Sequence, residues 1–151
     1  MLMTANYKPG LALVSVLLGL CLFFTPASAE FFIKGMDLTE DEFNEYILTN
    51  EPEYVEESII FFHDPNCGSC IPAHEFLEEY LLEYPDTEVL MISLADGTES
   101  REMFDEMKAK FERNPVFVPV LYIGPVALEG YDEIKDYFEE TYQWYIQTKP
   151  E

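Results

Sequence analysis

The chain has 151 residues, with 30 Asp and Glu against eight Lys and Arg, which gives a net charge of -22 and a pI near 4.1. This length suits one ordinary domain. The excess of negative charge repels phosphate backbones, so it disfavours sequence-independent binding to nucleic acids. Because 48% of the residues are apolar and 15% are aromatic, the chain can bury a core, unlike an acidic disordered tail.

The first 29 residues have the pattern of a secretory signal peptide. Lys8 precedes an apolar run over residues 11–24, and Pro26 and three small residues ending at Ala29 follow it. The run is shorter than the roughly 20 residues that a membrane-spanning helix needs. We expect cleavage after Ala29; the alternative is an uncleaved anchor that tethers the domain to the membrane. Both place the domain outside the cytoplasm, in the periplasm, in the cell envelope or secreted.

Residues 30–151 are expected to form one domain that carries the remaining two cysteines. All 30 acids and seven of the eight bases lie in this part, so its net charge is -23. Cys21 leaves with the signal, and Cys67 and Cys70 stay. A single Cys-x-x-Cys pair closes a very short loop, which gains little denatured-state entropy and cannot act as a disulfide scaffold. The pair therefore indicates a chemically reactive site rather than a structural disulfide.

The hydrophobic pattern predicts the element order βαβαββα after a short N-terminal unit. Thr39 and Glu42 form a capping box for the first helix, which is expected to run to Leu48. Further helices are expected over 69–84, 99–111 and 131–145, and strands over 31–33, 58–63, 88–94, 116–123 and 126–129. A crossover between parallel strands followed by a terminal hairpin predicts an α/β fold, with a central mixed β-sheet flanked by helices on both faces.

The two cysteines lie where a predicted strand ends and an amphipathic helix begins. Backbone N–H groups and the dipole at a helix N-terminus stabilise a thiolate, so the pKa of Cys67 should be lowered. Cys67 is therefore expected to attack a substrate disulfide, and Cys70, one turn further on, to resolve the mixed disulfide. No Lys or Arg lies between Lys34 and Arg101, so the negative field should keep the lowering of the Cys67 pKa modest.

With this motif in this context, the chain from about Ser58 to Tyr145 resembles the thioredoxin-like superfamily. The resemblance implies a thioredoxin-like fold in which Pro119, with a cis peptide bond to Val118, opens the strand that faces the dithiol. It also implies that the Val118 backbone pairs with substrate. Gly130 and the helix after it look like the closing segment of that fold. The implied activity is thiol-disulfide exchange on protein disulfides or dithiols. The protein is expected to act as a monomer, to need no cofactor, and to exchange electrons with a membrane-bound redox partner.

The chain departs from ordinary thioredoxins around the motif. Gly68 and Ser69 stand between the cysteines in place of Gly-Pro, and Asn66 stands in place of the preceding Trp. Phe61 occupies the position of the buried acid that assists the resolving thiol in that family. The proton of Cys70 must then pass to water or to one of three side chains, His63, Asp64 and His74.

Two other functions fit the same residues. Cys67, Cys70 and His74 offer three ligands for copper or zinc, which predicts a metal carrier. A thioredoxin-like fold without redox activity predicts an adaptor. Within the oxidoreductase interpretation, the sequence leaves the direction of electron flow open, and the high acidity fits either a salty habitat or basic substrates.

Overall fold

The computed structural model describes residues 30–55 and 58–149, so the expected signal peptide lies outside the described residues. Its centre is a six-stranded sheet in the order β2-β1-β6-β5-β3-β4. Only β3 and β4 pair in parallel; the other neighbours are antiparallel. The elements in chain order are β1 (Phe31–Ile33), β2 (Met36–Leu38), α1 (Glu40–Thr49), β3 (Ile59–His63), α2 (Cys70–Glu83), β4 (Leu90–Ser93), α3 (Thr98–Lys110), β5 (Val120–Ile123), β6 (Val126–Glu129) and α4 (Tyr131–Ile146).

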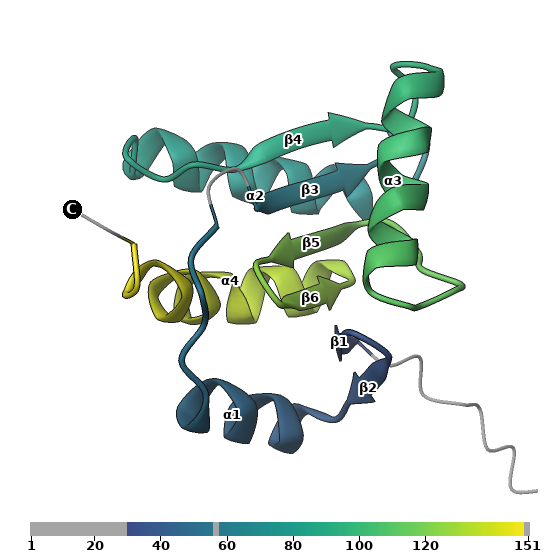
Figure 1. Cartoon of the computed structure of the whole chain (residues 1–151). Helices are drawn as coiled ribbons and strands as arrows, with labels where there is room; N and C mark the ends of the chain where they lie inside the picture. The colour runs from purple at the N-terminus through teal and green to yellow at the C-terminus, as the bar shows by residue number, and fades with distance from the viewer. Residues whose placement is uncertain (1–29, 56–57, 150–151) are drawn as a thin grey trace, which may run out of the picture.

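Helices cover both faces of this sheet (Figure 1). Alternate side chains of each strand point to opposite faces, so the chain forms two apolar clusters. One cluster joins the sheet to α1, α2 and α4 through residues such as Phe43, Leu77 and Phe138. The other joins it to α3 through Met107, beside the α3 C-cap Phe111. The predicted mixed α/β architecture is confirmed, and no helix among the described residues is long and apolar enough to cross a membrane.

Strand order brings the cysteine motif beside the proline-containing segment before β5. β3 runs toward the cysteines, and β5 is its antiparallel neighbour, with Phe62 opposite Val120. The end of β3 therefore lies beside the start of β5. Residues 64–70 and residues 117–119 meet at this edge of the sheet, although some 50 positions separate them in the chain.

The capping box predicted for the first helix is present. The Thr39 hydroxyl accepts a hydrogen bond from the backbone N–H of Glu42, and the Glu42 carboxylate accepts one from the backbone N–H of Thr39 at 2.8 Å. These bonds satisfy two N–H groups that a helix start leaves unpaired. They fix where α1 begins, and Asn50 ends it.

Two predicted strands are shorter than expected. The strand predicted over 116–123 begins only at Val120, because Pro119 has no N–H to offer the sheet. The strand predicted as buried over 88–94 is Leu90–Ser93, and it is an edge strand. Having one neighbour strand, it leaves Leu90 45% exposed, and only Ile92 is buried.

A hairpin near the start of the domain was not predicted. β2 pairs with β1 through a turn at Gly35, whose φ of +69° is the left-handed region that favours glycine. β2 has three residues and only Leu38 is buried. So short and exposed a strand has no recognisable alternation of apolar and polar residues.

Candidate dithiol site

Cys67 and Cys70 are both free thiols at the junction of β3 and α2, as their spacing predicts. A turn positions them: the backbone N–H of Cys67 donates to the Asp64 carbonyl at 3.0 Å, and that of Cys70 donates to the Cys67 carbonyl at 3.1 Å. The Asp64 carboxylate also accepts the backbone N–H of Asn66 at 2.8 Å. Cys67 is thus held just ahead of the helix, while Cys70 is the first residue of α2.

Hydrogen bonds from its neighbours make the Cys67 thiol the more acidic of the two. Burial alone would raise its pKa, but hydrogen bonds from the side chains and backbones of Cys70 and Ser69 outweigh that effect and lower the pKa. Ser69 precedes α2 but does not cap it with its side chain; its Oγ lies 3.3 Å from the Cys67 Sγ instead. The predicted direction of the shift is confirmed.

Cys70 has the opposite environment. Its side chain is 1% exposed. Burial, together with a hydrogen bond to Cys67, raises the pKa of Cys70 to about 12. The pair therefore combines an accessible, more acidic thiol with a buried, protonated one, which is the division that an attacking and a resolving cysteine require.

Val118 and Pro119 lie against the dithiol. The Cys67 thiol donates a hydrogen bond to the Val118 carbonyl at 3.4 Å. The Val118–Pro119 peptide bond is cis, as the resemblance implies, and so is Asn114–Pro115, which the sequence did not single out. Val118 is half-buried and Pro119 is buried, so backbone groups rather than a charged side chain face the sulfur from this side.

The three candidate proton acceptors share a pocket with Cys70. This pocket of about 310 Å³ is lined by Cys70, His63, Asp64 and His74, together with Pro65, Ile71, Glu75 and Glu78. The two imidazole rings lie 4.6 Å apart between centroids. Asp64 Oδ1 accepts two hydrogen bonds from Asn66, which ties this carboxylate to the turn before α2.

The Phe61 ring packs against the histidine pair. It is fully buried, and its ring stacks on His63 with centroids 5.3 Å apart and an interplanar angle of 7°. Burial, and next the nearby His74, lower the pKa of His63. His74 contacts Glu78 through Nδ1 at 3.3 Å. A proton on Nδ1 would leave the other ring nitrogen of His74 as the basic atom.

The metal-carrier interpretation needs a grouped set of ligands. Among residues 30–55 and 58–149, no three His, Cys, Asp or Glu side chains are grouped so as to hold a metal ion. Cys70 and His74 do line one pocket, but the proposed trio with Cys67 is not such a group. Metal carriage stays a prediction.

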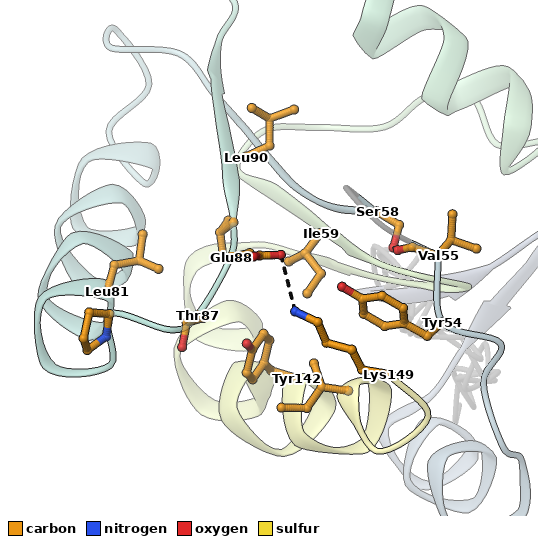
Figure 2. Close-up of a pocket in the computed structure, with 13 residues that line it drawn as sticks. Tyr54, Val55, Ser58, Ile59, Leu81, Thr87, Glu88, Leu90, Tyr142 and Lys149 are labelled. Atoms are coloured by element: carbon orange, nitrogen blue, oxygen red, sulfur yellow. Dashed lines mark hydrogen bonds and ion pairs between the residues drawn. The ribbon is translucent and has the colours of Figure 1, made fainter. Parts of the chain in front are cut away.

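A second pocket, of about 730 Å³, shares no residue with the dithiol site. It lies where the segment before β3 meets α2, β4 and the end of α4, and the Glu88 carboxylate pairs there with Lys149 at 3.6 Å (Figure 2). Tyr54, Tyr142 and aliphatic side chains line the rest. No cysteine or histidine is among the residues that line this pocket, whereas the smaller pocket is lined by Cys70, His63 and His74.

Three residues of the site were not singled out from the sequence as site residues. Glu78 follows His74 by four positions in α2, a spacing that could have indicated the pair. The contact between Ser69 and Cys67 depends on the turn geometry. Glu129 is buried at the end of an apolar strand and accepts the backbone N–H of Phe117 at 3.1 Å; its only signal is an acid in a run of buried residues.

Comparisons with protein-family models, with curated proteins and with solved structures found no match for this chain.

Proposed function

We propose that this protein is an exported thiol-disulfide oxidoreductase with a thioredoxin-like fold, acting on protein disulfides through Cys67 and Cys70. The observation that carries the proposal is the difference between the two thiols: the pKa of Cys67 is lowered, while that of Cys70 is raised to about 12. Support for the fold comes from the order of the elements and from Val118 and Pro119 lying against Cys67.

In the reductive direction, the Cys67 thiolate attacks one sulfur of a substrate disulfide. A new S–S bond forms to Cys67, the substrate S–S bond breaks, and the leaving thiolate takes up a proton. Cys70 then loses its proton to water or to the histidine pair and attacks the Cys67 sulfur. The substrate leaves as a dithiol, reduced by two electrons, and the protein retains a Cys67–Cys70 disulfide. The same steps in reverse donate a disulfide.

The histidines replace the acid that Phe61 displaces. Cys70 is buried and protonated, so its attack needs a proton acceptor within reach. His63 and His74 line the same pocket as Cys70, and neither is fully enclosed. They accept the proton in this proposal, while Asp64 holds the turn.

Turnover and the reduction potential test the proposal. The purified, metal-stripped protein should reduce or oxidise a peptide disulfide catalytically, and its Cys67–Cys70 couple should equilibrate with glutathione buffers. A strongly reducing potential would mark a reductase supplied by a membrane-bound electron donor, and an oxidising one a donor of disulfides to exported proteins. If the protein exchanges no thiols but binds copper or zinc stoichiometrically, the metal-carrier interpretation would replace this one. If it does neither, the adaptor interpretation would.

A further inference from the structure

The segment before Pro119 is held by a side chain of the sheet. The backbone N–H of Phe117 donates to the Glu129 carboxylate at 3.1 Å. Phe117 as a whole is 60% exposed, so packing of its own side chain does little to hold this backbone. Two residues after Phe117, the Pro119 carbonyl accepts the backbone N–H of Gly130 at 2.9 Å. Glu129, the last residue of β6, and Gly130, which follows it, therefore hold the two ends of the segment 117–119.

Glu129 is itself rigidly placed. It lies opposite Val120 in the β5–β6 ladder and is 7% exposed. Its carboxylate pairs with Arg113 Nη1 at 2.5 Å. Arg113 in turn pairs with Asp37 Oδ1 at 2.7 Å and lies 4.2 Å from the centroid of the Phe32 ring. The carboxylate is thus tied to β6, to the end of α3, and through Arg113 to β1 and β2.

This anchor lies one residue from the contact with the nucleophile. Phe117 is held by Glu129, and the next carbonyl, that of Val118, accepts the Cys67 thiol at 3.4 Å. A single peptide group, between Phe117 and Val118, separates the Phe117 N–H from the Val118 carbonyl, and peptide groups are planar, so only the φ and ψ angles of these two residues lie between the two contacts. The carboxylate therefore helps to hold the Val118 backbone in place beside Cys67.

We propose that Glu129 is a positioning residue for the substrate backbone. By holding Phe117 it fixes the Val118 peptide groups against which an extended substrate aligns next to Cys67, and Arg113 keeps the carboxylate in place. This inference rests on the proposed function. It predicts that Glu129 matters for disulfides within a peptide chain and hardly matters for a small disulfide, which needs only the Cys67 sulfur.

Two double variants isolate the anchor from the ion pair. Arg113→Met with Glu129→Gln removes both charges but keeps an oxygen that can accept the Phe117 N–H. Arg113→Met with Glu129→Leu removes the charges and the acceptor. In single-turnover reactions of the prereduced proteins, the Leu variant should reduce a peptide disulfide about tenfold more slowly than the Gln variant, the loss of one hydrogen bond to a preformed site. Hydroxyethyl disulfide should react with both at rates within about twofold.

Lys34→Gln is the matched control. It breaks a neighbouring ion pair, with Glu112 at 2.9 Å, whose side chains are 67% and 60% exposed, and it should leave both rates unchanged. Equal slowing of the Gln and Leu variants on the peptide, or equal loss on both disulfides, would overturn the positioning role. A wild-type protein that neither reduces these disulfides nor, once oxidised, oxidises the corresponding dithiols would instead refute the proposed function itself, and the inference with it.

Amide exchange tests the anchor without any substitution. In the unaltered protein the Phe117 N–H should exchange with solvent much more slowly than the amide of an exposed loop residue, because it is bonded to a buried carboxylate. Exchange at the rate of a free chain would contradict the inference even if the variants failed to fold.

Discussion

The two ends of the sheet are built differently. The cysteine end comprises residues 63–74 with residues 117–119, and the tyrosine end comprises the lining of the larger pocket together with Tyr145. At the cysteine end, two thiols three positions apart have pKa values shifted in opposite directions. At the tyrosine end, the Tyr145 hydroxyl accepts the Val55 N–H at 2.8 Å, and the exposed Glu88 and Lys149 form an ion pair.

The cysteines and histidines of the proposed site do not lie at the larger of these two pockets. The tyrosine end has more than twice the cavity volume, about 730 Å³ against 310 Å³. The contacts of its polar groups include the hydrogen bond of Ser58 with Tyr145 and the ion pair of Glu88 with Lys149. The cysteine end has the smaller cavity but contains a thiol of lowered pKa, a buried second thiol and two imidazoles. Substitutions at the two ends should therefore separate activity from stability.

The largest expected effect is the loss of activity in Cys67→Ser. A serine hydroxyl does not attack a disulfide at neutral pH, so turnover of a peptide disulfide should fall to the uncatalysed rate. Lys149→Gln, at the tyrosine end, should keep wild-type turnover, because an exposed ion pair contributes about 0–1 kcal/mol to stability and nothing to the thiols. Residual turnover in Cys67→Ser would show that the nucleophile lies elsewhere.

Gly124→Ala should give the largest loss of stability. Gly124 has a φ of +56°, and a methyl group there would meet the Tyr145 ring at 2.1 Å. We expect denaturant unfolding to show a loss of about 2–4 kcal/mol from overpacking and backbone strain. The folded fraction should alkylate at Cys67 at the wild-type rate. A changed alkylation rate would mean that the two ends of the sheet are coupled.

Ser69→Ala should have a moderate effect on the nucleophile alone. Removing the hydroxyl 3.3 Å from the Cys67 sulfur takes away one hydrogen bond that lowers the Cys67 pKa. The pH profile of iodoacetamide alkylation should shift to higher pH, and the rate near neutral pH should fall several-fold. Ser58→Ala, a serine substitution at the tyrosine end, is the control and should leave the profile in place.

The smallest effect concerns acid stability. The pKa of His63 is lowered, chiefly by burial, so the unfolded state takes up a proton before the folded state does. Stability linked to His63 is therefore present above its unfolded pKa of about 6.5 and is lost as the pH falls below it. His63→Gln should lose less stability than the wild type between about pH 7 and 5.5. Lys149→Gln should follow the wild type; identical slopes for all three would refute the assignment.

Most of the fold was predictable because its elements carry strong periodic patterns. The run Ile59–Phe62 is apolar throughout, as a central strand requires, and the capping box at Thr39 fixes α1. The errors fall where context overrides pattern. β4 looks buried in sequence, but its place at the edge of the sheet exposes Leu90, and only the assembled sheet determines which strand is outermost.

The placement of the two cysteines was predictable from their spacing, whereas the contacts that support them were predictable only in part. Cys67 and Cys70 are only three positions apart, so the local pattern of a strand followed by a helix is enough to place both at the start of that helix. The resemblance to thioredoxins predicts Val118 and Pro119 beside the dithiol, and Cys67 does contact Val118. The bond from Phe117 to Glu129, by contrast, joins residues that are unremarkable in the sequence. Both contacts depend on strand order and register, which no local pattern encodes.

Trapping a mixed disulfide tests the division of roles between the thiols most directly. Prereduced Cys70→Ser, mixed with a peptide disulfide, should accumulate a one-to-one adduct through Cys67 that mass spectrometry detects and dithiothreitol releases, because no resolving thiol remains. Cys67→Ser should form no such adduct near neutral pH, since the pKa of Cys70 is raised to about 12. Adducts at equal yield from both variants, or from neither, would contradict the assignment of Cys67 as the attacking thiol and Cys70 as the resolving one.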